Sequence, residues 1–184
     1  MKKLLLITGD LACGKSTFAK MLSKRYDTNL FFKDNIKELL GDTIGFSNRA
    51  ENLKLSVAAV EQMTLVFSEF AGLGKNLILE ANFHTYELEK LHEIAAQNGY
   101  SVLTLVFRAD TKLLHGRYLN RIANENRHPV HIIAVLDDYD DFAAYIGKAR
   151  GEFVPGETLQ VNADDFSYQT DVSLLQRLDA FMMD

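Results

Sequence analysis

Residues Ile7–Lys20 read ITGDLACGKSTFAK, and this stretch decides the fold. Gly9, Gly14, Lys15 and Ser16 fit the pattern GxxxxGK[ST], in which glycines let successive backbone N–H groups point at phosphate oxygens. In such a loop the lysine reaches the β- and γ-phosphates and the serine hydroxyl binds Mg²⁺. The stretch therefore predicts a phosphate-binding loop for ATP and Mg²⁺. The predicted nucleotide contacts are Gly9, Asp10, Leu11, Ala12, Cys13, Gly14, Lys15, Ser16 and Thr17.

The alternative is an ordinary glycine-containing turn between a strand and a helix. The sequence around the motif argues against it, because the apolar run Leu4–Thr8 precedes the loop and an amphipathic segment, Lys15–Tyr26, follows it. A lysine in the first turn of a helix also opposes the helix dipole, so Lys15 needs an anion beside it. Cys13 either becomes oxidisable beside Lys15 or fills a variable loop position, and the second interpretation is favoured.

The composition is that of a globular protein without a broad basic surface. The chain has 184 residues, 47% of them hydrophobic and 24% charged, with a net charge of −5. An acidic chain of this kind is a poor partner for long nucleic acid. The single cysteine fits a reducing compartment, and the N-terminal apolar run, Leu4–Ile7, is too short for a signal sequence. We therefore expect a cytoplasmic protein with one domain, residues 1–184, and no membrane contact.

Short apolar runs alternate with longer periodic segments, which is typical of an α/β protein whose parallel sheet is covered by helices. The predicted strands are Leu4–Thr8, Leu30–Phe32, Asn76–Glu80, Ser101–Phe107 and Thr158–Val161. The predicted helices are Lys15–Tyr26, Asn35–Leu40, Glu51–Ala71, Tyr86–Gln97, Thr111–Asn124, His131–Lys148 and Asp171–Met182. Gly41 is interpreted as the end of the second helix, and Pro129 as a break between the fifth and sixth.

Asp34 lies in FFKDNIK, Phe31–Lys37, directly after the second predicted strand. The carboxyl ends of parallel strands meet at one edge of the sheet, so we expect Asp34 on the same edge as the phosphate loop. A carboxylate there accepts the proton of an attacking hydroxyl, which is the role of an aspartate in kinases. The alternative is that Asp34 only caps the helix Asn35–Leu40. The residues alone leave both interpretations open, and the two are compatible.

Glu80 ends the third predicted strand in NLILEANF, Asn76–Phe83. An acidic residue at the end of a buried strand beside a phosphate loop is the usual magnesium partner, most often an aspartate. We therefore assign Ser16 and Glu80 to Mg²⁺, with a solvated strand end as the alternative for Glu80. His84 is interpreted as polar surface rather than as a substrate contact. Two acidic runs are interpreted as helix caps or solvated faces without metal: Asp137–Asp141 and Asp164–Asp165.

Arg117, Arg121 and Arg127 form a basic cluster in LLHGRYLNRIANENRHPVH, Leu113–His131. The first two are four residues apart and share one helix face. We interpret residues 111–131 as a small helical lid whose arginines close over the triphosphate and stabilise charge in the transition state. The alternative is a solvated face whose arginines pair with nearby acids such as Glu125.

Together these motifs resemble the small phosphate-loop kinases that are grouped with the AAA-type ATPases. Relatives in that group are the zeta-toxin, polynucleotide kinase and chloramphenicol phosphotransferase-like enzymes, with the gluconate and shikimate kinases. The resemblance covers essentially the whole chain and rests on GDLACGKST, KDNIK, LILEANF and the arginine stretch that ends at Pro129. It implies an adenylate-kinase-like fold, a single domain with five parallel strands in the order 2-3-1-4-5 and a small lid.

The resemblance also assigns roles to individual residues. It implies that Asp34 activates the acceptor hydroxyl, and that Lys37 stands where polynucleotide kinases carry an acceptor-binding arginine. A lysine lacks the bidentate phosphate contact of a guanidinium, which weakens the case for a nucleic-acid end as acceptor. Glu80 replaces the commoner aspartate, and its longer side chain favours contact with magnesium through a water. The resemblance places the adenine pocket near Asn162–Asp165.

The sequence therefore predicts an ATP-dependent kinase that phosphorylates a hydroxyl of a small molecule. The acceptor is expected near the start of the long helix, around Arg49–Lys54. Two alternatives stay open: a nucleotide-binding ATPase or regulator without an acceptor, and a kinase of nucleic-acid 5′-hydroxyl ends. The predicted catalytic residues are Lys15, Asp34, Arg117, Arg121 and Arg127, and the predicted acceptor contacts are Asp34 and Lys37.

Overall fold

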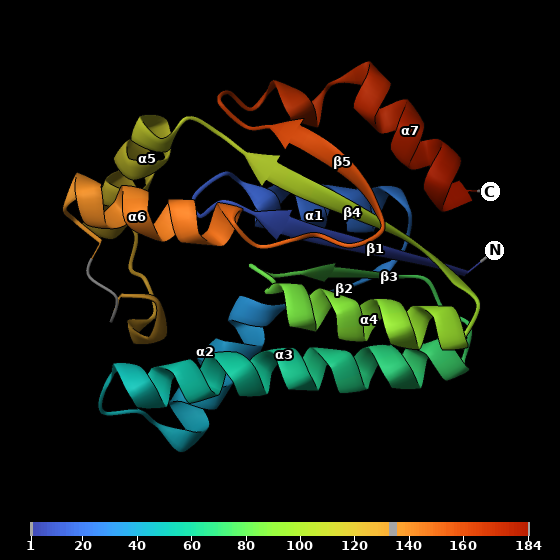
Figure 1. Ribbon diagram of the computed structural model, residues 1–184, viewed down its shortest axis with the longest axis horizontal. Helices are drawn as coiled ribbons and strands as arrows, with labels where there is room; N and C mark the ends of the chain where they lie inside the picture. Colours follow the sequence, from blue (N-terminus) through green and yellow to red (C-terminus); the bar gives the residue numbers. More distant parts are fainter. Residues whose placement is uncertain (1, 133–135, 184) are drawn as a thin grey trace.

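The computed structural model of the chain describes residues 2–132 and 136–183. Its centre is one parallel sheet with the strand order β2-β3-β1-β4-β5, so the predicted fold class and strand order are confirmed (Figure 1). The strands are β1 (Lys2–Gly9), β2 (Asn29–Phe32), β3 (Leu77–Glu80), β4 (Tyr100–Arg108) and β5 (Glu157–Asn162). The helices are α1 (Lys15–Arg25), α2 (Lys33–Ile44), α3 (Arg49–Gly72), α4 (Thr85–Gln97), α5 (Thr111–Asn124), η1 (Pro129–His131), α6 (Tyr139–Arg150), η2 (Ser167–Gln169) and α7 (Val172–Met183).

Helices cover both faces of the sheet because side chains alternate along the central strands. Along β1, Leu5 and Ile7 pack in one fully buried cluster with α1 and α7. Leu4 and Leu6 point the other way and pack in a second cluster with α3 and α4. Figure 1 shows the sheet between these two helical layers. None of the helices in the described residues is long and apolar enough to cross a membrane.

The carboxyl ends of the strands lie at one edge of the sheet, as the sequence predicted. In the register, Glu80 at the end of β3 is level with Phe32 on one side and with Ile7 on the other. Gly9 at the end of β1 is level with Phe107 of β4. This alignment brings the loops after β1, β2 and β3 together, and these loops carry the predicted chemistry.

The segment after α5 differs from the prediction of one helix over His131–Lys148. The structure has the short helix η1 at Pro129–His131, and α6 begins only at Tyr139. The reason is the side chain of Asp138, which accepts hydrogen bonds from the N–H groups of Asp140 and Asp141 and so caps α6 there. This confirms a capping role in the first acidic run. Part of the predicted helix, residues 133–135, lies outside the described residues.

Gly41 does not end α2, which was the role predicted for it. The helix continues to Ile44 and ends at Gly45, whose φ of 78° only a glycine adopts readily. Gly41 is buried against η1, and a Cβ atom added to it would lie 2.5 Å from Cγ1 of Val130. The glycine therefore makes room for Val130, so its role is in packing rather than in termination.

Candidate active site

The loop Gly9–Thr17 joins β1 to α1. Gly9 has φ = 120°, and a Cβ there would overlap the backbone of Phe107 on β4, so only a glycine fits. Gly14, with φ = 84°, is the N-cap of α1 and makes no side-chain cap, which leaves the N-terminal N–H groups of α1 facing the loop. A helix N-terminus behind a curled glycine loop is an anion-binding geometry.

Lys15 lies in the first turn of α1 with 7% of its surface exposed. Its Nζ donates to the carbonyl oxygens of Gly9, at 3.1 Å, and of Asp10, at 2.6 Å. The buried thiol of Cys13 donates to the same Asp10 carbonyl, and burial raises its pKa although Lys15 acts to lower it. This environment favours the interpretation of Cys13 as a space-filling side chain over that of a reactive thiolate.

Ser16 and Glu80 meet at the end of β3. The Ser16 Oγ donates to Glu80 Oε2 at 2.8 Å, and the glutamate is 6% exposed. Burial raises the pKa of Glu80, while Lys15 and the Ser16 hydrogen bond act to lower it. In the part of the chain that the structure describes, no group of three or more His, Cys, Asp or Glu could hold a metal alone. The pair nonetheless fits Mg²⁺, which takes few protein oxygens and completes its shell with phosphates and waters.

Asp34 is the second residue of α2, and its exposed side chain does not cap that helix. The N-cap is Phe32, and no side-chain cap is formed. The carboxylate lines the same cavity as the phosphate loop. Its charge also reaches Glu80, where it adds to the effect of burial in raising the pKa. The structure thus brings Asp34 into the neighbourhood of Lys15, Ser16 and Glu80.

The three predicted lid arginines lie on one cavity but have different partners. Arg117 donates to the carbonyls of Ala163 and Asp164, each at 2.7 Å, and its guanidinium stacks 4.5 Å over the ring of Phe166. Arg121 pairs with Glu125 at 3.2 Å, which is the alternative that the sequence left open.

Arg127 is the predicted lid arginine that lies within electrostatic range of Asp34. Burial, followed by the charge of Arg121, lowers the pKa of Arg127, and Asp34 acts in the opposite direction. In the described residues no hydrogen bond or ion pair engages its side chain. Of the three arginines, Arg127 is therefore the one whose guanidinium is available to bind a ligand without first breaking another contact.

These elements enclose a cavity of about 910 Å³. Its floor is the phosphate loop, one wall is α2 with the first turns of α3, and the opposite wall comes from α5 and α6. His84 also lines it, as the N-cap of α4, with Nδ1 2.9 Å from Glu152 Oε1. The predicted nucleotide and acceptor contacts line this cavity with a single exception, which is Asp10.

Asp10 is fully buried and directs its carboxylate away from the cavity. It accepts from Arg108 Nη1 at 3.1 Å, from Arg150 Nη2 at 2.7 Å and from the N–H of Ala109 at 3.3 Å. Sequence reasoning missed both arginines. The signal that could have found them is the acid itself, because a carboxylate in a phosphate-binding loop needs a cation to neutralise it.

Lys37 is buried between α2, α3 and η1. Its Nζ donates to Asn52 Oδ1 at 2.8 Å and to the carbonyl of Val130 at 3.1 Å, and Asn52 Nδ2 donates to the same carbonyl at 3.0 Å. Burial, with Lys33 adding to it, lowers the pKa of Lys37 to about 8, although Asp34 acts to raise it. Lys37 therefore links η1 to α2 and α3 while also lining the cavity.

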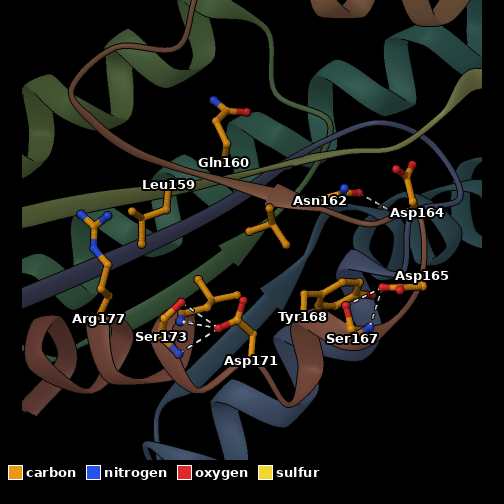
Figure 2. A pocket seen from close by; sticks show the side chains of 12 residues that line it. Leu159, Gln160, Asn162, Asp164, Asp165, Ser167, Tyr168, Asp171, Ser173 and Arg177 are labelled. Carbon is orange, nitrogen blue, oxygen red and sulfur yellow. Dashed lines mark hydrogen bonds between the residues drawn. The ribbon is translucent and has the colours of Figure 1, made fainter.

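A second cavity of about 460 Å³ lies between β5 and α7 (Figure 2). Asp165 accepts from Ser167 and Asp171 from Ser173, while Asp164 accepts from the N–H of Asp110. Asn162 Oδ1 accepts from the N–H of Asp164. Asp164 and Asp165 are both exposed, which agrees with the interpretation of this run as a solvated face.

Residues 4–143 match the AAA domain family AAA_33. The chain belongs to this family. No curated protein matches it significantly in sequence.

Several solved structures share this fold over nearly their whole length. One from Chloroflexus aurantiacus J-10-fl, whose assignment as a kinase is provisional, is 25% identical, with 97% of each chain covered and a TM-score of 0.82. A sugar kinase from Janibacter sp. HTCC2649 is 12% identical, with 100% of this chain and 95% of that chain covered and a TM-score of 0.65. Shikimate kinase from Bacteroides thetaiotaomicron is 18% identical, with 99% of each chain covered and a TM-score of 0.61.

Proposed function

We propose that the protein is an ATP-dependent kinase that transfers the γ-phosphoryl group to a hydroxyl of a small molecule. The observation that carries this proposal is the position of Asp34. Its carboxylate is not used as a helix cap and lies on the same cavity as the phosphate loop. An acceptor hydroxyl bound there would have a proton acceptor on one side and the transferring phosphoryl on the other.

The donor half follows from the loop. ATP would lie on Gly9–Thr17, with Lys15 turning from the carbonyls of Gly9 and Asp10 to the β- and γ-phosphates. Ser16 and Glu80 would hold Mg²⁺, directly or through water. When bound, that ion neutralises charge on the phosphate oxygens. Phe166 and Arg117 line the cavity beside the turn after β5, where the base of the nucleotide is expected.

The acceptor half consists of α2 and the first turns of α3. Asp34 would accept the proton of the attacking hydroxyl, and Arg127 would stabilise the charge that develops on the phosphoryl group. Arg121 could join it by releasing Glu125. The kinase names of the similar structures, one for sugars and one for shikimate, support a small-molecule acceptor.

The test is label transfer from γ-labelled ATP to a panel of sugars, nucleosides, antibiotics and oligonucleotides. One class of small molecule should be labelled, and Asp34→Asn should lower that transfer by about 10²- to 10⁴-fold while nucleotide affinity stays the same. Glu69→Gln is the matched control, because this exposed carboxylate on α3 does not line the cavity. If the rate of ATP hydrolysis is unchanged by every acceptor and by Asp34→Asn, the protein is instead an ATPase or regulator. Labelling of oligonucleotides alone would point to a kinase of nucleic-acid ends.

A further inference from the structure

One end of the cavity, which we call the acceptor end, carries more positive charge than is needed to bind the triphosphate of ATP. We use "acceptor end" for the part lined by α2, the first turn of α3 and the segment that follows α5. Four cations line it: Lys33, Lys37, Arg49 and Arg127. Asp34 is the acid among them. This excess stands in a chain whose net charge is −5, so the overall composition does not account for it.

The remaining acids on the cavity balance these cations only in part. Glu125 pairs with Arg121 and Glu152 with His84. Glu80 accepts from Ser16, and its charge also interacts with those of Lys15 and Lys33.

Of the other cations on the cavity, Lys15 and Arg117 donate to backbone carbonyls and Arg108 pairs with Asp10. Lys148 of α6 also lines the cavity and has no ion pair among the described residues. Most of the unbalanced charge is therefore at the acceptor end.

Lys37 is the strongest sign of this imbalance. Its ammonium group is buried, with 8% of the residue exposed, and its hydrogen bonds go to a neutral amide and a backbone carbonyl. The negative charge of Asp34 reaches Lys37, but no anion is in hydrogen-bond contact with the buried ammonium group. A buried cation without such a partner is costly, and an anion placed beside it offsets that cost. Among the described residues, the side chains of Lys33, Arg49 and Arg127 have no ion pair either.

The cations at the acceptor end are placed to bind a group on the acceptor molecule, not only the triphosphate of ATP. Lys37 and Arg49 come from α2 and α3, which contribute nothing to the phosphate loop. The exposed side chain of Leu53, one turn after Arg49, lines the same wall and offers apolar contact. Cations beside an apolar side chain suit a ligand that has both a carbon skeleton and an acidic group.

We propose that the acceptor is itself an anion, a small hydroxy compound that carries a carboxylate or a phosphate. This inference rests on the proposed kinase activity. The acidic group lies among Lys33, Lys37 and Arg49, and the hydroxyl that receives the phosphoryl group lies at Asp34. A neutral polyol of the same size leaves the buried ammonium uncompensated and binds more weakly. The site therefore selects acidic acceptors over neutral ones by charge.

The test measures binding rather than turnover. Two matched pairs of six-carbon compounds are used: glucose with glucose 6-phosphate, which are rings, and sorbitol with gluconate, which are open chains. Each compound is titrated against the protein saturated with ADP and Mg²⁺, which fill the phosphate loop, and the thermal unfolding midpoint is followed. At least one anion should bind tenfold or more tightly than its neutral partner, and whichever does so identifies carboxylate or phosphate as the recognised group.

Variants show where the anion binds. Arg49→Gln should weaken anion binding about tenfold, whereas Arg177→Gln should not, because Arg177 is an exposed arginine of α7 that lines the other cavity. Equal binding of the neutral and anionic member in both pairs, no binding by any compound, or anion binding that survives Arg49→Gln would overturn the inference. If a neutral acceptor is labelled by ATP and the anions do not bind, the kinase proposal stands and this inference fails. If anions bind at Arg49 but no compound is labelled by ATP, the anion site stands and the kinase proposal fails.

Discussion

The carboxylate of Asp10 lies 2.7 Å from the guanidinium of Arg150, although 140 residues separate them in the sequence. Asp10 belongs to the phosphate loop and Arg150 to the last turn of α6, so the contact ties the loop to the helix that follows the predicted lid. Arg150 also donates to the carbonyl of Ala109, which directly precedes the N-cap of α5. Both ends of the α5–α6 segment are therefore anchored at one buried acid, through the N–H of Ala109 and the guanidinium of Arg150.

Asp10→Asn should destabilise the protein by about 2–3 kcal/mol. The amide keeps the shape of the carboxylate but leaves two arginines without a counter-charge, and breaking a buried pair costs about 3–5 kcal/mol. We expect a loss below that range because the side chains of Arg108 and Arg150 are 28% and 34% exposed, so water can solvate them. Urea unfolding measures the change. Glu61→Gln, which removes an exposed pair with Lys90, is the control and should cost under about 1 kcal/mol. Equal losses in the two variants would contradict the anchoring role.

Much of the fold could be predicted from the sequence because the signals are local. Apolar runs and helical periodicity located the strands and most helices to within a few residues, and the helix Thr111–Asn124 matches α5 at both ends. The alignment of parallel strand ends also explains why Glu80, at the end of β3, lies beside the phosphate loop and accepts a hydrogen bond from Ser16. The motif and the sheet geometry together sufficed to predict that these two side chains are neighbours, while their role in binding Mg²⁺ stays a prediction.

The features that were missed depend on contacts between distant residues. Nothing near Asp10 in the sequence indicates Arg150, and nothing near Gly41 indicates that Val130 packs against it. A glycine after a helical run is a fair stop signal by itself, and only the position of η1 shows that this one serves packing. The sharing of Lys37 between Asn52 and the carbonyl of Val130 is also a product of the tertiary fold.

Gly41→Ala and Gly147→Ala should have opposite effects on stability. Both glycines lie inside helices, where alanine is intrinsically favoured by about 1 kcal/mol. At Gly147 a Cβ would meet nothing within 4 Å, so the gain is realised and the variant is stabilised by about 0.5–1 kcal/mol. At Gly41 the Cβ would overlap Val130, and overpacking of this kind costs about 1–3 kcal/mol. Thermal unfolding midpoints that move in the same direction for both variants would refute the packing role of Gly41.

Lys37 should make stability depend on pH above neutrality. Its pKa is lowered from 10.5 to about 8 in the folded protein, mainly by burial. Between these values the unfolded chain binds a proton that the folded protein does not, so stability rises with pH relative to a variant without the group. Below pH 8 both states are protonated and the burial penalty is present in full.

The comparison that isolates Lys37 is with Lys37→Met. From pH 7 to pH 9.5 the free energy of unfolding of the wild type should gain about 2 kcal/mol relative to the variant, as an upper value. Subtracting the two curves cancels the titration of every other group that both proteins share. A difference that stays constant over this range would show that the folded protein keeps Lys37 protonated.

Glu80→Gln should raise the Mg²⁺ concentration needed for half-maximal phosphoryl transfer by about 10- to 100-fold, the usual effect of losing a supporting ligand. The amide can still accept the hydrogen bond from Ser16, which is 2.8 Å from the carboxylate, so the loop geometry is retained and the lost charge is isolated.

Glu80→Asp keeps the charge on a shorter side chain and distinguishes two modes of contact. A side chain that reaches the ion through water tolerates the shortening, because the water can move, whereas direct coordination does not. Mg²⁺ titrations of the three proteins at saturating ATP therefore report both whether Glu80 supports the ion and how it does so. An unchanged Mg²⁺ requirement in Glu80→Gln would leave the buried carboxylate as a partner of Ser16 alone.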